Sequence, residues 1–128
     1  MAKTVLIVED YEDTRVMMTA LIQLYGHNVV AAEDGYDAIE KARKHSPELI
    51  LMDLAMPGMD GVTATAMIRQ FEDFADTPII ALTAYGELRG QEALDAGCND
   101  LIAKPMDFDR LGPLLNKYLD SNGREGSR

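Results

Sequence analysis

Five short apolar runs alternate along the chain with longer segments of helical periodicity. The apolar runs are predicted strands, and they lie at Thr4–Val8, Asn28–Ala32, Glu48–Met52, Thr77–Leu82 and Asp100–Ala103. Several of them are apolar at consecutive positions and not at alternate ones, which is typical of strands that are covered on both faces. The pattern therefore predicts a parallel sheet between two layers of helices.

Helices are predicted after each of these strands. The first has a single apolar stripe with i, i+3, i+4, i+7 spacing, formed by Met17, Ala20, Leu21 and Leu24. The next three are predicted at Gly35–His45, Gly61–Gln70 and Glu87–Ala96. The fifth repeats the spacing of the first at Leu111, Leu114, Leu115 and Tyr118. Pro113 lies inside this last helix and is expected to kink or unwind its first turns.

The order of elements is therefore strand then helix, five times over, which favours an α/β fold. Right-handed crossovers between parallel strands produce a doubly wound three-layer sandwich. We expect a flavodoxin-like five-stranded sheet with strand order 2-1-3-4-5, in which ligands bind at the carboxyl ends of strands 1 and 3. Residues 1–120 are expected to form this domain, and the polar residues 121–128 a flexible tail.

Charge and composition exclude several classes of protein. The 128 residues include 12 Lys and Arg against 22 Asp and Glu, for a net charge of −10, so direct nucleic-acid binding is not expected. The apolar runs are too short for a membrane span. The chain begins without a secretion signal and has a single cysteine, Cys98, so a reducing, cytoplasmic location is expected.

Polar side chains follow four of the five predicted strands, at the edge of the sheet where ligands bind. Glu9 and Asp10 follow the first strand, Asp53 the third, Thr83 the fourth and Lys104 the fifth. Each alone could be a capping, loop or surface residue. Together they place three carboxylates at one rim, and Mg²⁺ would relieve the repulsion between them. Asp53 is then the best candidate for a nucleophile toward phosphorus.

The residues around these positions resemble the signature of response-regulator receiver domains. The resemblance covers Lys3 to about Leu119, with the family's order and spacing. The matching segments are Val8-Glu9-Asp10, Leu51-Met52-Asp53, Met56-Pro57-Gly58-Met59-Asp60-Gly61, Ala81-Leu82-Thr83-Ala84 and Lys104-Pro105. The resemblance implies a phosphorylation-dependent switch of a two-component phosphorelay, which catalyses only its own phosphorylation and dephosphorylation.

The resemblance also implies how the site binds its metal ion and its phosphoryl group. Asp53 would accept the phosphoryl group. Asp10, Asp53 and the backbone carbonyl of Ala55 would bind Mg²⁺ directly, and Glu9 would bind it through water. Thr83 would donate a hydrogen bond to the phosphoryl group and move toward it.

Two further expectations concern the end of the fifth strand and the usual aromatic side chain of the family. Lys104 would form an ion pair with the phosphoryl group and precede a cis peptide bond to Pro105. At Leu101 the family usually has Tyr or Phe, whose ring turns inward when the threonine moves. The usual aromatic readout is therefore absent or transferred, and Tyr85 is a candidate to replace it.

The implied partners are a histidine kinase or histidine phosphotransfer protein as phosphodonor, and a downstream protein. Because no output domain follows in the sequence, we expect the output to be a protein–protein contact through the fourth helix, fifth strand and fifth helix. A receiver fragment of a larger DNA-binding regulator or hybrid kinase is an open alternative. An aspartyl-phosphate hydrolase is disfavoured, because such enzymes commonly have a carboxylate where this chain has Ala55. A flavodoxin-like cofactor site is disfavoured by the acidic Tyr11-Glu12-Asp13.

Overall fold

The computed structural model describes residues 2–84, 87–104 and 107–119. The strands in these ranges are β1 (Thr4–Val8), β2 (Asn28–Ala32), β3 (Leu49–Asp53), β4 (Ile79–Thr83) and β5 (Asp100–Ala103). The helices are α1 (Glu12–Leu24), α2 (Gly35–His45), α3 (Gly61–Arg69), α4 (Glu87–Ala96) and α5 (Leu111–Leu119). None of these helices combines the length and apolar character needed to cross a membrane.

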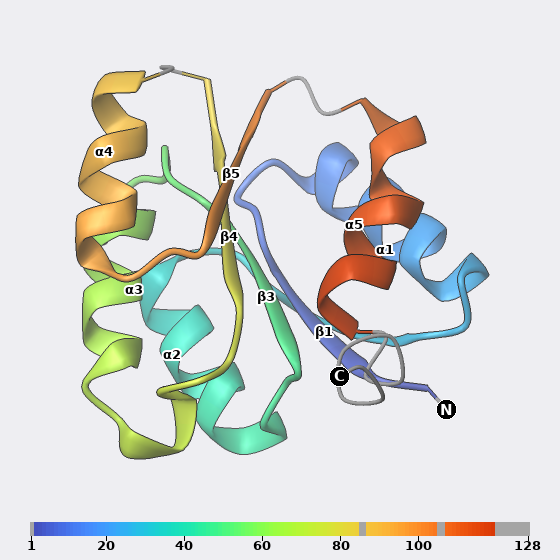
Figure 1. The fold of residues 1–128 in the computed structure, drawn as a ribbon, viewed down its shortest axis with the longest axis horizontal. Coiled ribbons are helices and arrows are strands. Elements are labelled where there is room, and N and C mark those ends of the chain that lie inside the picture. The colour runs from blue at the N-terminus through green and yellow to red at the C-terminus, as the bar shows by residue number, and fades with distance from the viewer. Residues whose placement is uncertain (1, 85–86, 105–106, 120–128) are drawn as a thin grey trace.

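The strands form one parallel sheet in the order β2-β1-β3-β4-β5, as predicted. Helices α1 and α5 cover one face of the sheet, and α2, α3 and α4 cover the other (Figure 1). The doubly wound three-layer architecture is therefore confirmed. Its switch point lies between β1 and β3, where the chain changes direction across the sheet.

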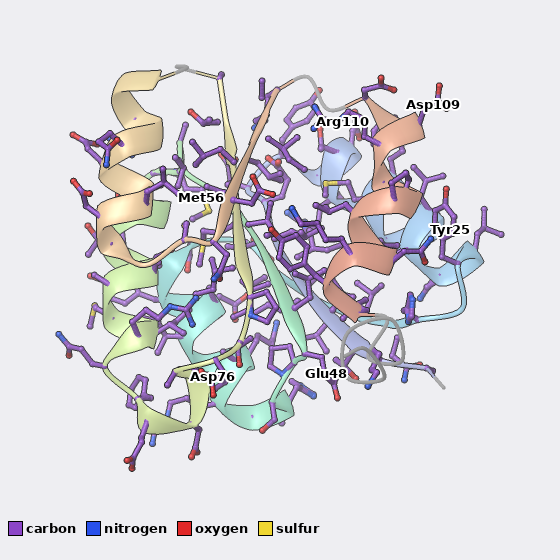
Figure 2. The ribbon with its side chains drawn as sticks, viewed as in Figure 1. Tyr25, Glu48, Met56, Asp76, Asp109 and Arg110 are labelled. Atoms are coloured by element: carbon purple, nitrogen blue, oxygen red, sulfur yellow. The ribbon has the colours of Figure 1, made fainter. Side chains whose placement is uncertain are left out.

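Alternate residues of each inner strand face opposite helical layers. In β1, Val5 and Ile7 pack toward α1 and α5, whereas Leu6 and Val8 pack toward α2, α3 and α4. All four side chains are fully buried. This burial on both faces explains the consecutive apolar residues from which we predicted strands covered by helices on both sides. Figure 2 shows side chains filling both layers.

The predicted apolar stripe of α1 is wrong except at Leu21, which is half-buried and packs against the core. The buried residues of α1 are Met18 and Ile22, whereas Met17 is 49% and Leu24 is 83% exposed. The helix has apolar residues in two overlapping i, i+4 series, so periodicity alone did not determine which series faces the sheet. The guanidinium of Arg15 donates to the carbonyl of Glu9 at 2.8 Å, which connects the start of α1 to the end of β1.

Two strands begin and end later than predicted. β3 begins at Leu49, and the side chain of the preceding Glu48 accepts a hydrogen bond from the Thr4 amide at 2.7 Å. β4 begins at Ile79, directly after Pro78, which has no N–H to donate to the ladder. At their other ends, Asp53 and Thr83 are the last residues of their strands and not the first residues of loops.

The remaining boundaries agree closely with the predictions. α3 ends at Arg69, one residue earlier than predicted, and a short 3₁₀ turn at Glu72–Phe74 was not predicted. A second 3₁₀ turn, Phe108–Arg110, runs directly into α5. Pro113 lies in the first turn of α5, which is α-helical from Leu111 onward, so the unwinding expected there is not observed. The predicted tail, residues 121–128, lies outside the described residues.

The start of α3 packs against the backbone of the candidate nucleophile. A Cβ atom added to Gly61 would overlap the carbonyl oxygen of Asp53 and lie 2.8 Å from the Cα of Leu54. We expect Gly61→Ala to lower the free energy of unfolding by about 2 kcal/mol or more. A matched control is Gly90→Ala, whose nearest neighbour is the movable Leu101 Cδ1. Urea unfolding of both variants measures the effect, and equal losses would contradict it.

Candidate functional site

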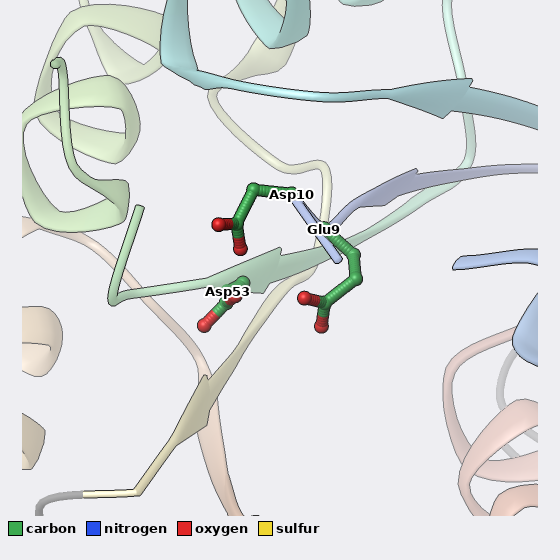
Figure 3. A group of neighbouring side chains, drawn as sticks. All are labelled: Glu9, Asp10 and Asp53. Atoms are coloured by element: carbon green, nitrogen blue, oxygen red, sulfur yellow. The ribbon is translucent and has the colours of Figure 1, made fainter. Parts of the chain in front are cut away.

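Three carboxylates meet at the carboxyl edge of the sheet. Glu9 and Asp10 follow β1 directly, and Asp53 is the last residue of the neighbouring strand β3. One carboxylate oxygen from each lies within 4.8 Å of the others, and Figure 3 shows the three side chains converging. The acidic residues predicted from the sequence are therefore brought together by the pairing of β1 with β3.

Lys104 lies next to this carboxylate cluster. Its ammonium is 3.2 Å from Oδ2 of Asp53 and 3.5 Å from Oε1 of Glu9. Its backbone amide donates to the carbonyl of Thr83 at 2.9 Å, so the ends of β4 and β5 are joined at this edge. Thr83 is 4% exposed. The structure thus places both predicted phosphoryl-binding residues at the edge that holds the carboxylates.

Two of the three carboxylates are buried and only partly hydrogen-bonded. Glu9 is 1% exposed and Asp53 is fully buried, whereas Asp10 is exposed. Glu9 Oε2 accepts from the Tyr11 amide, and Asp53 Oδ1 accepts from the Ala55 amide, both at 3.1 Å. Glu9 Oε1 and Asp53 Oδ2 accept no hydrogen bond from the described residues and face the Lys104 ammonium as ion pairs.

Burial and the neighbouring charges shift the pKa values of Asp53 and Lys104. Burial and then the charge of Glu9 raise the pKa of Asp53 to about 7, against the opposing effects of Lys104 and the Ala55 amide. Burial alone would lower the pKa of Lys104, but Asp53 and Glu9 outweigh it and raise that pKa. One lysine therefore does not fully compensate the negative charge of this site.

The donor set fits magnesium. The three converging side chains offer only carboxylate oxygens, and among the described residues no His or Cys belongs to the group. Hard divalent cations prefer such oxygens. A cation between the carboxylates would also give the buried oxygens Glu9 Oε1 and Asp53 Oδ2 a second source of positive charge. Receiver domains generally bind Mg²⁺ at such an acidic cluster.

A pocket of about 430 Å³ opens beside this site, and Glu9 and Lys104 line it together with apolar side chains that include Met17, Met18 and Phe108. A larger pocket, of about 700 Å³, lies at the opposite edge of the sheet. Glu48 and Asp76, labelled in Figure 2, line that larger pocket. The smaller pocket is the chemically relevant one, because it opens on the carboxylate cluster through Glu9 and on the ammonium of Lys104.

One contact with the site was not predicted from the sequence, and two predictions concern residues that the structure does not describe. The guanidinium of Arg89 in α4 donates to the carbonyl of Leu54, directly after Asp53, at 3.2 Å. No spacing signal connects these residues, which are 35 positions apart. The predictions for Tyr85 and for the peptide bond to Pro105 lie outside the described residues.

Comparisons with known proteins agree with this geometry. Residues 5–116 match the model of the response regulator receiver domain. The chain is 41% identical to the chemotaxis protein CheY of Bacillus subtilis over 122 residues, which cover 94% of this chain and all of that protein. It is 37% identical to the signal transduction histidine-protein kinase BarA of Escherichia coli, of which it spans only 14%.

A solved structure shows the same fold. The receiver domain of the sensor histidine kinase PA1611 from Pseudomonas aeruginosa, with a magnesium ion coordinated in its active site cleft, superimposes with a TM-score of 0.86 at 34% identity. The match covers 94% of this chain and 99% of that one. The family match, the fold and the carboxylate edge agree. The chain therefore belongs to the response regulator receiver domain family, whose members are signalling domains of two-component phosphorelays and not classical enzymes.

Proposed function

We propose that Asp53 accepts the phosphoryl group of a phosphohistidine and that the chain thereby acts as a phosphorylation-dependent switch. The observation that carries this proposal is the position of Asp53. It is a fully buried carboxylate at the end of the central strand, with one oxygen bound by the Ala55 amide and the other facing Lys104. Asp10 and Glu9 stand beside it on the neighbouring strand.

The transfer needs one nucleophile and several cationic or hydrogen-bonding groups. A carboxylate oxygen of Asp53 forms a P–O bond while the P–N bond to the donor imidazole breaks. The electron pair stays on the imidazole nitrogen, which then takes up a proton from solvent. Lys104 pairs with the phosphoryl oxygens and the hydroxyl of Thr83 donates to them. Bound Mg²⁺ would neutralise negative charge on the phosphoryl and carboxylate oxygens.

We assign Asp10, Asp53 and the backbone carbonyl of Ala55 as direct Mg²⁺ ligands and Glu9 as a ligand through water. The exposed Asp10 side chain forms no hydrogen bond or ion pair with the described residues, so it can turn to a cation without loss. Glu9 is already engaged by the Tyr11 amide and Lys104. Asp10 is therefore the more available of the two.

This assignment predicts unequal losses of metal affinity. We expect Asp10→Asn to weaken Mg²⁺ binding by about tenfold or more, because it removes a direct charged ligand, and Glu9→Gln to weaken it by less. Calorimetric titration of both variants with Mg²⁺ tests the order. Equal or reversed losses would mean that the direct and water-mediated ligands have been exchanged.

Labelling by a small phosphodonor tests the proposed function itself. The intact chain is incubated with acetyl phosphate, with Mg²⁺ or with a chelator, and digested for mass spectrometry. We expect phosphate that is labile to both acid and base, as an acyl phosphate is, in the peptide that contains Asp53, and only when Mg²⁺ is present. Absence of labelling, or labelling at another residue, would overturn the proposal.

Receiver domains interact with histidine kinases or histidine phosphotransfer proteins. We infer that such a donor docks at the carboxyl edge of the sheet, in the cytoplasm, and that a downstream protein binds the face of α4, β5 and α5. The 41% identity to the chemotaxis protein CheY of Bacillus subtilis, which is matched over its whole length, supports a signalling switch of this kind. The match to a kinase receiver supports the alternative of a receiver within a larger protein. Residues 1–120 would be the receiver domain in either case.

A further inference from the structure

An arginine of α4 contacts the loop that follows the phosphoacceptor. We call residues 54–60, which connect Asp53 to α3, the β3–α3 loop. Nη2 of Arg89 donates to the carbonyl of Leu54 at 3.2 Å and lies 3.4 Å from Oδ2 of Asp60, at the other end of this loop. Nη1 lies 3.5 Å from Glu92 on the same helix. One guanidinium therefore connects α4 to both ends of the β3–α3 loop.

The β3–α3 loop is in turn attached to Asp53 by short contacts. The carbonyl of Leu54 that accepts from Arg89 also accepts from the Gly61 amide at 3.1 Å. The next amide, of Ala55, donates to the Asp53 carboxylate at 3.1 Å. Ala55 also carries the carbonyl assigned above to the metal ion. A displacement of this loop when the site is filled would therefore reach the Arg89 guanidinium through two or three hydrogen bonds.

The Arg89 contacts are more than an exposed surface pair. The side chain is 28% exposed, and its Nε is buried without a hydrogen-bond partner among the described residues. Asp60 is the N-cap of α3, and its Oδ1 accepts from the Thr63 amide at 2.9 Å. The charged guanidinium of Arg89 faces both a backbone carbonyl and a capping carboxylate. Hydrogen bonds from a charged donor are stronger than those between neutral groups.

The contact of α4 with β5 next to Arg89 is apolar. Gly90, next to Arg89, packs against β5, where a Cβ atom would lie 2.7 Å from Cδ1 of Leu101. Leu101 occupies the position at which receiver domains usually have an aromatic residue, so the readout by ring rotation is missing here. Arg89 supplies a different connection between the site and α4.

We propose that Arg89 is a positioning residue that couples occupancy of the Asp53 site to α4. Arg89 does not touch the phosphoryl group; it acts through the Leu54 carbonyl and Asp60. The inference rests on the proposed function, because the signal it transmits is the filling of that site. Coupling between two sites is reciprocal, so α4 held by Arg89 should also favour binding at the site.

Hydrogen–deuterium exchange of the intact chain tests the coupling. The probe is beryllofluoride with Mg²⁺, which mimics a phosphoryl group on a carboxylate. In the wild-type protein we expect the probe to slow amide exchange in α4 by about fivefold, which corresponds to about 1 kcal/mol, while α2 serves as an internal reference. In Arg89→Gln, which keeps a similar helix propensity, saturating probe should still bind but should leave exchange in α4 nearly unchanged.

Two matched variants separate coupling from stability. Glu92→Gln removes the outer ion pair without touching the β3–α3 loop, so it should keep the wild-type protection of α4. Asp60→Asn keeps an N-cap of similar strength but removes the charge that faces Arg89, so it should lose part of the protection. Melting temperatures of all variants are measured alongside. A role that is merely structural would lower the melting temperature of Arg89→Gln and leave the protection by the probe intact.

The possible outcomes distinguish this inference from the proposed function. If the wild-type protein binds the probe and α4 is not protected, or if Arg89→Gln retains full protection, Arg89 does not carry the coupling and the inference fails alone. If the wild-type protein does not bind the probe, the proposed function fails and the inference fails with it. Protection that is lost in Arg89→Gln and kept in Glu92→Gln supports it.

Discussion

Asp53→Asn reduces Mg²⁺-dependent phosphate incorporation from acetyl phosphate by at least about 1,000-fold, to the background of the assay. The amide has nearly the shape of the carboxylate but is a poor nucleophile toward phosphorus. Asp53 is fully buried at the end of β3 and is held by the Ala55 amide, so no neighbouring carboxylate can take its position without moving a strand end. The loss should therefore be complete and not partial.

The control for this experiment is Asp34→Asn. Asp34 lies outside the β3–α3 loop, and it caps α2 through a hydrogen bond from the Asp37 amide that asparagine can also accept. Incorporation in this variant should stay at the level of the wild-type protein. Phosphate incorporation that persists in Asp53→Asn, located by mass spectrometry, would remove Asp53 from its assigned role and identify the residue that replaces it.

The fold was predictable because burial on both faces leaves a direct mark in the sequence. The inner strands need apolar residues at consecutive positions such as Leu49 to Met52, and in β3 and β4 the polar residue is the last one of the strand. In a parallel sheet these ends lie at one edge. The meeting of Glu9, Asp10 and Asp53 therefore followed from the strand order alone.

The rest depended on contacts that a periodic pattern does not encode. The rotation of α1 is one case, because both Met17 and Met18 belong to apolar series and only packing against the sheet buries Met18. The contact of Arg89 with Leu54 is another, because it joins elements that are distant in sequence through one long side chain. Long polar side chains reach several possible partners, and the choice among them is made by the folded backbone.

Without metal, the protein should lose stability as the pH rises from about 4 to about 7. Burial and the charge of Glu9 raise the pKa of Asp53 to about 7 in the folded state, whereas the unfolded chain has the ordinary value of 3.8. Between these values the folded state binds a proton that the unfolded state has released. The stability that Asp53 contributes is therefore fully present below its unfolded pKa. As the pH rises from that value to the folded pKa, the free energy of unfolding falls by up to about 1.4 kcal/mol per pH unit.

The pH dependence of stability has the opposite sign for carboxylates whose charged form is stabilised in the folded state. Hydrogen bonds from Thr63 and the charge of Arg89 outweigh burial and lower the pKa of Asp60, and its contribution is lost only as the pH falls below its unfolded value. The two effects therefore occupy different pH ranges. Burial lowers the pKa of His27 from its ordinary value of 6.5, so this group adds a slope of opposite sign within the range from 4 to 7, and only the comparison with Asp53→Asn isolates the contribution of Asp53.

Urea unfolding in the presence of a chelator, at several pH values, measures this slope in the wild-type protein and in Asp53→Asn. The variant has no group that titrates at this position. Between pH 4 and pH 7 its free energy of unfolding should therefore fall by roughly 3 kcal/mol less than that of the wild-type protein. The slope is the informative quantity, because the amide also alters the hydrogen bonds to Ala55 and Lys104 and so shifts the absolute stability. Asp10→Asn should keep most of the wild-type slope, because Asp10 is exposed.

Added Mg²⁺ should reduce the wild-type slope, because it binds the folded site and favours the ionised Asp53. The same addition should have little effect on the slope of Asp53→Asn. Parallel stability curves for the wild-type protein and Asp53→Asn without metal would show that Asp53 is ionised at ordinary pH in the folded chain. Lys104 would then compensate the buried carboxylates fully, and the argument that the site requires a second cation would fail with it.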